Sequence, residues 1–233
     1  MLYVIGTPIG NLSDITLRAL EALKSADVIA AEDTRHSGNL LRHYEIRKPM
    51  VSYHQHNEAM RTAQLAERLA AGETVALITD AGMPGLSDPG ARLIACCIRE
   101  GFPYTVLPGA SAILTALVGS GFGLDRFSYG GFLPVKSGGR ERDLRAAGAR
   151  DETSVFFESP HRLTKTLAVC AEIMPDRLIC VARELTKKFE EFRRGTAAEL
   201  LAHYHAHPPK GEITMVISGT KQQPGPRSEP PVI

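Results

Sequence analysis

Short apolar runs alternate with longer segments of helical spacing along the first half of the chain. Leu2–Ile5 reads as a short strand, and Leu17, Leu20 and Leu23 then recur at the spacing of one helix face. This change of pattern repeats to about residue 118, which is typical of α/β domains. Strands are expected at Leu2–Ile5, Val28–Ala31, Met50–Tyr53, Thr74–Ile78 and Tyr104–Leu107, and a helix follows each of them. The first helix is expected to begin at a cap on Ser13 or Asp14 and to carry Leu17, Leu20 and Leu23. The other helices are expected at about 35–44, 57–71 (with Asn57 as its cap), 89–100 and 111–118.

A glycine-rich stretch at 119–123, GSGFG, interrupts this pattern and predicts a domain boundary. Strand patterns resume afterwards, with helical patterns between them, so we expect a second domain with a mixed sheet. The last residues contain four prolines and no periodicity, which is typical of disorder. The expected strands are Phe127–Phe132 (bent at Gly130-Gly131), Val155–Phe157, Leu178–Val181 and Ile213–Ile217; the helices are about 160–173 and 196–206; and the domains are 1–121, 122–219 and a tail at 220–233.

Composition adds little to this picture except by exclusion. Apolar residues make up 43% and charged residues 23%, as in an ordinary soluble globular protein, and the net charge is +1. A nucleic-acid partner therefore requires a local basic surface, since no global field favours it. The first residues lack a basic signal-peptide start and no run approaches the ~20 apolar residues of a membrane span, so we expect a cytoplasmic protein.

Polar loops follow most of the predicted strands. In open α/β sheets, ligands bind outside the carboxyl ends of the strands, so the shared placement of these loops favours one composite ligand site. The loops are Gly6–Asn11, Glu32–Arg35, Thr79–Gly90 and Pro108–Ser111 in the first half, and Glu158–Arg162 and Arg183–Lys187 in the second.

The loop TDAGMPGLSDPG, residues 79–90, is the most informative of them. It holds three glycines, two prolines and two aspartates, more than a plain connection needs. The phosphate-binding patterns G-x-x-x-x-G-K-[ST] and G-x-G-x-x-G are absent from the chain. Asp80 at the strand end would repel phosphate and suits a cationic or donor-rich ligand. The alternative is that Asp80 and Asp88 are turn or cap residues.

Other polar clusters leave two interpretations open. Glu32, Asp33 and Arg35 have the composition of an active site, but Asp33 or Thr34 could equally cap the next helix. The histidines lack a third ligand or an H-E-x-x-H pattern, so no metal site is expected. Two basic segments are either solvated faces or nucleic-acid contacts, and Phe189 and Phe192 in the second could stack on bases or pack in the core. The first contains Lys136, Arg140, Arg142, Arg145 and Arg150, and the second Arg183, Lys187, Lys188, Arg193 and Arg194.

Taken together, these stretches resemble a known family. IGTPIGNLSDIT, AEDTRHS, TDAGMPGLSDPG, LPGASA, GFLP, FESPHR, ARELTKKFEE and KGEITMVI are similar, in matching order over residues 2–219, to bacterial 16S ribosomal RNA 2′-O-methyltransferases of the ribosomal RNA small subunit methyltransferase I family. That family belongs to the tetrapyrrole methylase superfamily. Its members often continue into a further helical segment, whereas this sequence ends in the Pro-rich tail.

The resemblance implies a two-domain α/β fold in which each domain is a sheet flanked by helices. It also implies S-adenosylmethionine in a cleft between the domains, a homodimer, and methylation of the ribose 2′-hydroxyl of a cytidine in the decoding region of 16S rRNA within the 30S subunit. The alternative within the superfamily is methylation of a tetrapyrrole or other small acceptor. A non-catalytic RNA-binding or nucleotide-sensing module is a further alternative.

The family's cofactor positions fall on loops of both halves. We expect the catalytic groups among the charged loop residues, because a weakly acidic hydroxyl needs a base or a stabilising cation. The segment 136–150 is the candidate RNA-positioning loop. The cofactor positions are Pro8, Asp80, Ala81, Gly82, Leu86, Ser111, Ala112, Phe157, Leu185 and Gly211, and the catalytic candidates are Glu32, Asp33, Arg35, Glu158, Glu184 and Lys187.

Overall fold

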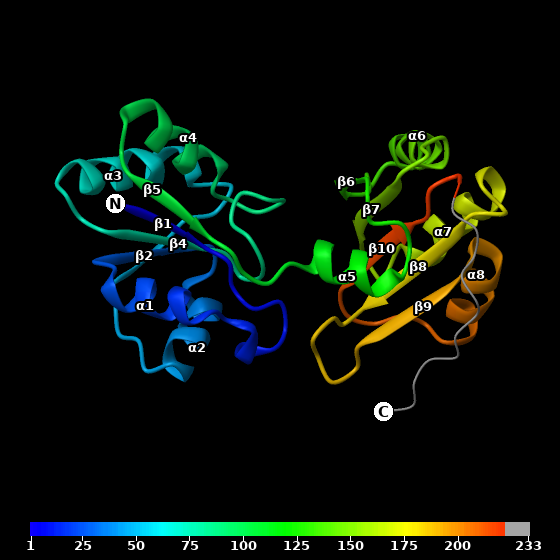
Figure 1. Cartoon of the computed structure of the whole chain (residues 1–233), viewed down its shortest axis with the longest axis horizontal. Helices are drawn as coiled ribbons and strands as arrows, with labels where there is room; N and C mark the ends of the chain where they lie inside the picture. The colour runs from blue at the N-terminus through cyan, green and yellow to red at the C-terminus, as the bar shows by residue number, and fades with distance from the viewer. Residues whose placement is uncertain (222–233) are drawn as a thin grey trace. The chain divides into compact units, whose positions relative to one another are not determined.

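The computed structural model describes residues 1–221, which form two compact units, Met1–Ser111 and a second that begins at Ala112 (Figure 1). The first unit contains a five-stranded parallel sheet of order β3-β2-β4-β1-β5. Its strands are β1 (Leu2–Ile5), β2 (Val28–Ala31), β3 (Met50–Ser52), β4 (Val75–Ile78) and β5 (Tyr104–Leu107). Its helices are the short 3₁₀ turn η1 (Leu12–Asp14), α1 (Leu17–Ser25), α2 (Thr34–His43), α3 (Glu58–Ala70) and α4 (Ala91–Glu100).

Helices cover both faces of this sheet, because alternate strand residues point to opposite faces. Ile5, Ile29 and Ile78 pack in one apolar cluster with Leu23 of α1 and Leu41 of α2. The intervening strand residues form a second cluster with α3 and α4. Full burial of each such aliphatic side chain stabilises the fold by roughly 1.5–3 kcal/mol. The second cluster includes Leu2, Val4, Val28, Leu65, Leu77 and Leu93.

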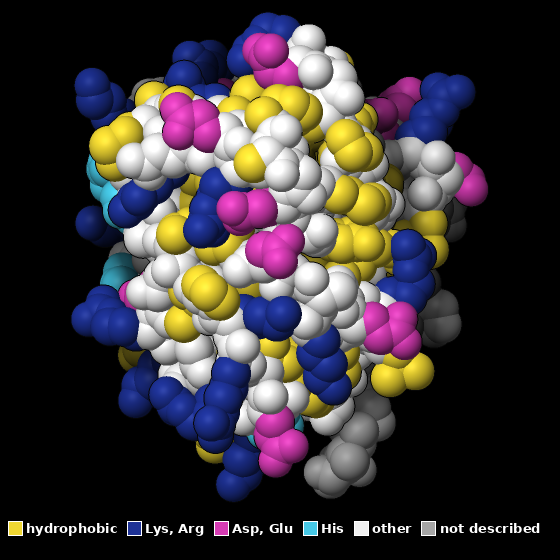
Figure 2. All heavy atoms as spheres, turned by 90° about the vertical axis from the view of Figure 1, so that its left-hand side faces the viewer, with side chains coloured by type: hydrophobic (Ala, Val, Ile, Leu, Met, Phe, Trp, Pro, Cys, Tyr) yellow, Lys and Arg dark blue, Asp and Glu magenta, His cyan; other side chains and the backbone are white. Residues whose placement is uncertain are grey.

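One face of the first unit is chemically mixed. Figure 2 shows hydrophobic, basic and acidic side chains interspersed on the face turned toward the viewer. Exposed apolar residues of the unit include Ile98, Tyr104 and Val106. This mixture agrees with the formal net charge of +1, which gives no dominant field.

The second unit contains a mixed sheet of order β6-β7-β10-β8-β9. β6 and β7 are parallel, whereas β10 is antiparallel to both neighbours and β8 is antiparallel to β9. The strands are β6 (Phe127–Phe132), β7 (Thr153–Glu158), β8 (Leu178–Arg183), β9 (Glu191–Thr196) and β10 (Ile213–Ile217), and the helices are α5 (Ala112–Ser120), α6 (Ser137–Gly148), α7 (Leu163–Ile173) and α8 (Ala197–Ala206).

One face of this sheet packs against α6, α7 and α8. Leu144, Leu167 and Leu200 of these helices meet Val181 and Met215 of the strands in a single buried cluster. Helix α5 contacts β7, β8, β9 and β10, and its buried side chains lie outside that cluster, which places it on the other face. None of the helices within residues 1–221 combines the length and hydropathy that a bilayer span requires.

The predicted α/β architecture with helix-flanked sheets is confirmed. Most predicted strands begin and end within one or two residues of the observed bounds. The expected bend in β6 coincides with a shift of register between Tyr129 and Phe132. Helix α5, which we assigned to a first domain ending at 121, lies in the second compact unit because it packs on that unit's sheet. The predicted disordered tail lies, from residue 222 onward, outside the described residues.

The first helix begins later than predicted. Thr16, and not Ser13 or Asp14, is its N-cap, and the Thr16 hydroxyl accepts a hydrogen bond from Ala19 N at 3.1 Å. Asn57 does precede α3, but its side-chain oxygen accepts from His54 N at 2.9 Å and makes no cap bond to the helix.

Two elements of the second unit were not predicted. The segment expected to be an RNA-positioning loop is helix α6, whose inward positions are Arg140, Leu144 and Ala147. The sequence shows no helical pattern here because a charged residue, Arg140, occupies a buried position directly after Gly138 and Gly139. Strand β9, EFRRGT, lies at the sheet edge, and its half-buried charged residues do not alternate with apolar ones.

Candidate functional site

Three loops meet at the carboxyl edge of the first sheet, because β4, β1 and β5 are neighbours and parallel. Thr7 N donates to Gly82 O at 2.9 Å and Gly82 N donates to Thr7 O at 3.0 Å, which joins the loops after β1 and β4. The loops after β1 and β5 touch through backbone. A Cβ placed on Gly109 would lie 2.9 Å from Gly6 Cα, closer than real contacts allow.

Gly82 leaves open space beside its backbone within this group of loops. Its φ is +78°, and a Cβ there would find only Ile9 Cγ2 at 3.8 Å and the Ala110 carbonyl oxygen at 3.9 Å. The space beside the Gly82 Cα is therefore free within the first unit. Close by, the buried Thr79 hydroxyl has no hydrogen-bond partner among the described residues, while the Thr79 carbonyl accepts from the Thr7 hydroxyl at 3.0 Å. A free backbone face and an orphaned hydroxyl are features of a ligand site.

Carboxylates gather beside this backbone. Asp80 Oδ1 accepts from Asp33 N at 3.1 Å, which ties the loop after β4 to the loop after β2. Burial and the neighbouring Asp80 raise the pKa of Glu32, against opposing contributions from the Asp80 backbone and His54. Burial, followed by the charges of Glu32 and Asp80, raises the pKa of Asp88 to about 6. The cluster therefore favours a cationic ligand.

Asp33 and Arg35 have a local structural role. Asp33 is the N-cap of α2, and its carboxylate accepts from Arg35 N at 2.8 Å and from the Arg35 guanidinium at 3.1 Å. These hydrogen bonds lower the pKa of Asp33 to about 2. The structure therefore confirms the alternative that Asp33 caps the helix. A carboxylate of such low pKa is also a poor proton acceptor.

Glu158 at the end of β7 is buried and fully engaged. Its carboxylate pairs with Arg162 at 2.6 Å and accepts from Ser159 N at 2.7 Å and from the Thr166 hydroxyl at 2.5 Å. The side chain has no exposed area. These bonds join the end of β7 to the start of α7, so the structure gives Glu158 a structural position.

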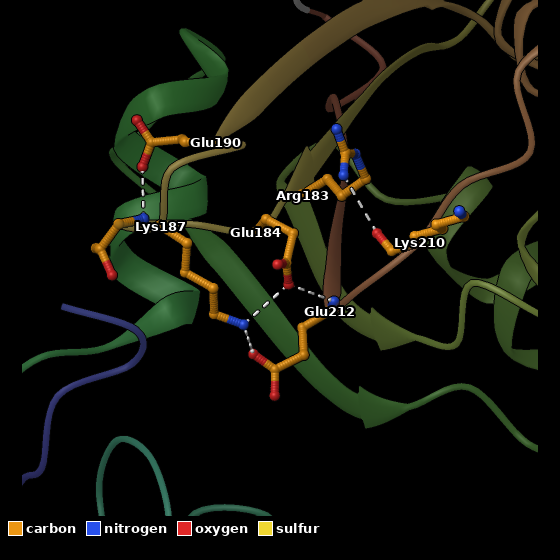
Figure 3. A network of polar contacts seen from close by, with 7 residues as sticks. Arg183, Glu184, Lys187, Glu190, Lys210 and Glu212 are labelled. Atoms are coloured by element: carbon orange, nitrogen blue, oxygen red, sulfur yellow. Dashed lines mark hydrogen bonds and ion pairs between the residues drawn. The ribbon is translucent and has the colours of Figure 1, made fainter. Parts of the chain in front are cut away.

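Glu184 and Lys187 lie in a network at the end of β8 (Figure 3). Lys187 Nζ donates to Glu184 Oε1 at 2.9 Å and to Glu212 Oε2 at 2.7 Å, and Glu212 N donates to Glu184 Oε1 at 3.0 Å. Burial alone would lower the pKa of Lys187, but the two carboxylates outweigh it and raise that pKa. Lys187 is therefore held as an ammonium ion, suited to stabilise negative charge and not to accept a proton.

The predicted cofactor positions fall into local groups. Pro8, Asp80, Ala81, Gly82 and Leu86 lie on the joined loops of the first unit, with Pro8 and Gly82 buried and Leu86 exposed. Ser111 and Ala112 flank the start of α5.

In the second unit, Gly211 and Leu185 come together with the Glu184 network. A Cβ on Gly211, whose φ is +81°, would overlap the Glu184 side chain. Leu185 is buried directly after Glu184. Phe157 stands apart on β7, half-buried against the rings of Tyr129 and Phe132.

Three residues that build the site were not among our candidates. Thr7 pairs with Gly82, Glu212 holds Lys187, and Glu58 Oε1 accepts from Gly90 N at 3.2 Å, which fixes the far end of the 79–90 loop to α3. Their partners lie 25 or more residues away along the chain. Thr7 lies inside the motif GTPIGN and Glu212 inside KGEITMVI, whereas Glu58 lies in none of the quoted motifs.

Comparisons with known proteins identify a family for the chain. The family model for Tetrapyrrole (Corrin/Porphyrin) Methylases matches residues 1–201. The Ribosomal RNA small subunit methyltransferase I of Synechocystis sp. is 44% identical over 97% of this chain and 81% of its own length. The protein of the same name from Thermotoga maritima is 45% identical over 94% of this chain and 98% of its own length.

Solved structures show the same fold at lower identity. The methyltransferase CobJ has a TM-score of 0.71 and 20% identity, covering 97% of both chains. A diphthine synthase has a TM-score of 0.69 and 14% identity, covering 95% of this chain and 91% of its own. From the family model and the relatives of 44–45% identity, the chain belongs to the ribosomal RNA small subunit methyltransferase I family within the tetrapyrrole methylases.

Proposed function

We propose that this protein uses S-adenosylmethionine to methylate the ribose 2′-hydroxyl of a cytidine in the decoding region of 16S rRNA. The observation that carries the proposal is identity of 44–45% over nearly the whole chain to proteins named Ribosomal RNA small subunit methyltransferase I. The nucleotide and the atom follow from the family resemblance of the loop motifs.

The first unit's loops fit this methyl donor. S-adenosylmethionine supplies a methyl group on a sulfonium, a carbon that is already electrophilic. Its two positive groups match the carboxylates of Glu32, Asp80 and Asp88, and it has no phosphate for them to repel. The open space beside the Gly82 backbone accommodates a ligand in contact with the chain. We propose that these loops position the donor, since alignment of oxygen, carbon and sulfur is the main catalytic task.

We further propose that Glu32 accepts the hydroxyl proton. Of the four candidate carboxylates, Asp33 and Glu184 have lowered pKa values through hydrogen bonds to Arg35 and Lys187, and Glu158 is saturated in a buried ion pair. Burial and Asp80 raise the pKa of Glu32, which makes it the stronger base. Lys187, an ammonium ion, is proposed to stabilise the developing alkoxide.

Sequence relatives favour rRNA over a tetrapyrrole or another small acceptor. The uroporphyrin-III and cobalt precorrin-4 methyltransferases among the similar structures are 18–22% identical to this chain, a likeness that extends to the fold alone. The cellular setting is part of the proposal: a cytoplasmic homodimer acting on the 30S subunit, supported by the family resemblance.

The test is to incubate the protein with labelled S-adenosylmethionine and 30S subunits from a strain lacking the enzyme, and to map the label. Label on a cytidine ribose is the expected result; label elsewhere on the subunit, or none, contradicts the proposal. In single turnover, Glu32→Gln should slow transfer by roughly 10²- to 10⁴-fold. Glu67→Gln, the same change at an exposed site on α3, should leave the rate unchanged.

A further inference from the structure

The turn between β8 and β9, residues 184–190, presents an aromatic ring and an ammonium group to solvent. Phe189 is 64% exposed, an unusual state for phenylalanine. Lys188 is also exposed, and its Nζ lies 5.7 Å from the centroid of the Phe189 ring. Neither side chain contributes to a buried cluster in the part of the chain that the structure describes.

This turn is held in one conformation, although its tip is exposed. Lys187 N donates to Glu184 O and Glu190 N donates to Lys187 O, both at 3.1 Å. Glu184 and Thr186 have φ values of +50° and +63°, which are strained for residues with a Cβ, and for Thr186 especially. Such strain persists only where surrounding contacts fix the backbone. The Phe189 ring therefore stands on a preorganised support.

The acidic side chains around the tip of the turn have partners, whereas the lysine at the tip has no carboxylate partner in the described part of the chain. Glu190 turns its carboxylate onto the turn itself, accepting from Thr186 N at 2.7 Å (Figure 3 shows Glu190 directed into the network). Glu184 is occupied by Lys187 and by Glu212 N. Lys188, by contrast, has no carboxylate partner among residues 1–221. The tip therefore offers a cation without a bound counter-charge beside the ring.

Phe192, three residues further along, is used differently. A Cβ on Gly119 would overlap the Phe192 ring, so this ring lies directly against helix α5. The Arg194 guanidinium lies 6.0 Å from the ring centroid and donates to the Ser120 carbonyl at 2.7 Å. Of the two phenylalanines that the sequence left open between packing and base stacking, Phe192 packs and Phe189 does not.

We propose that Phe189 is a stacking platform for an unpaired RNA base and that Lys188 contacts the phosphate beside it. The proposal rests on the proposed function and deepens it by naming a contact with the acceptor. An exposed aromatic ring next to a free cation is the combination that binds single-stranded nucleic acid, whereas a purely apolar partner would leave Lys188 unsatisfied.

The chain contains no tryptophan, which allows a direct test. Phe189→Trp introduces a single tryptophan, which can be excited selectively and retains the stacking surface. Its emission should be quenched by a single-stranded oligonucleotide of the 16S decoding region and not by a fully paired RNA duplex. Ile98→Trp, on α4 at a similar exposure of 61%, is the matched control and should not respond. Equal responses of both variants, or no response of either, overturn the proposal.

Affinity gives a second readout. Phe189→Ala should weaken binding of the oligonucleotide about tenfold, the factor that corresponds to about 1.4 kcal/mol of stacking. Lys188→Gln should reduce the slope of log affinity against log salt by about 0.7, the value for one phosphate on a single strand. Cofactor affinity and melting temperature should not change, because both side chains are exposed. Unchanged RNA affinity of Phe189→Ala contradicts the stacking role.

Two outcomes separate this inference from the proposed function. If the wild-type protein methylates 30S subunits but Phe189→Trp shows no RNA-dependent quenching, the platform is wrong and the function stands. If quenching occurs but no methyl is transferred, the platform stands and the function is wrong. Emission that changes with protein concentration in the absence of RNA indicates that a second copy of the chain covers the ring, and overturns the proposal.

Discussion

Replacing Gly82 by alanine tests the ligand-binding role of the 79–90 loop most directly. Gly82 has a φ of +78°, and a Cβ there has no neighbour closer than 3.8 Å within the first unit. The added methyl group therefore has room in the protein alone. If a ligand lies against the Gly82 backbone, the methyl group occupies the ligand's space.

Gly101 provides a matched control for the backbone cost. It follows α4 with a φ of +72°, and a Cβ there meets nothing within 4 Å. A residue with a Cβ costs roughly 1–2 kcal/mol in a left-handed conformation, so Gly82→Ala and Gly101→Ala should destabilise the protein by similar amounts. The melting temperature of each variant should fall by roughly 2–8 °C.

Affinity for S-adenosylmethionine should separate the two variants. We expect Gly82→Ala to weaken binding at least about tenfold, equivalent to about 1.4 kcal/mol, and Gly101→Ala to bind as the wild type does. Isothermal calorimetry gives the affinities, and thermal unfolding without ligand confirms the equal backbone cost. Wild-type affinity in Gly82→Ala refutes the reasoning, and so does an equal loss in both variants, since the loss would then follow from destabilisation.

Three further predictions concern the side chains around the loops. Glu158→Gln leaves Arg162 without its buried partner, so the free energy of unfolding in a denaturant titration should fall by about 3 kcal/mol while cofactor affinity is kept. The pKa of Asp88 is raised from 3.8 to about 6, so the folded protein binds the carboxyl proton of Asp88 more tightly than the unfolded chain does. The stability that this proton contributes is complete below about pH 4 and is lost as the pH rises through 6. Asp88→Asn should remove this pH dependence from the free energy of unfolding, measured by denaturant titration at a series of pH values. Glu58→Gln weakens the acceptor for Gly90 N at 3.2 Å, so calorimetry should show weaker cofactor binding by several-fold with little change in melting temperature; unchanged affinity contradicts the anchoring role.

The first sheet could be predicted from the sequence because its strands are buried on both faces. Val75–Ile78 and Val28–Ala31 are continuous apolar runs, as expected for central parallel strands. Edge strand β9 gives no such signal, since its residues are charged and half-buried. Helix α6 was missed because Arg140 occupies a core position. The hydrophobic pattern therefore identifies a helix or strand only where the buried positions hold apolar residues and the exposed positions hold polar ones.

The site was predicted as a set of loops but not as a set of contacts. Strand ends and turn residues select the 79–90 loop as a candidate. The roles of charged residues depend on partners distant in sequence, as Lys187 and Glu212 show, which lie 25 positions apart. Spacing alone does not reveal whether a carboxylate is free, capping a helix or saturated. Asp33 and Glu158 had the expected composition of catalytic groups, and their hydrogen bonds give them structural positions.

The strand order has a consequence for synthesis of the chain. The first sheet is complete once β5 has emerged from the ribosome, so this unit can fold while the rest is being made. In the second sheet the last strand, β10, lies in the middle and pairs with both β7 and β8. Until Ile217 is available, on the order of ten seconds later at about 5–20 residues per second, β7 and β8 each expose an unpaired edge. Nascent chains of this protein should therefore meet chaperones through their second half, after the first has become protease-resistant.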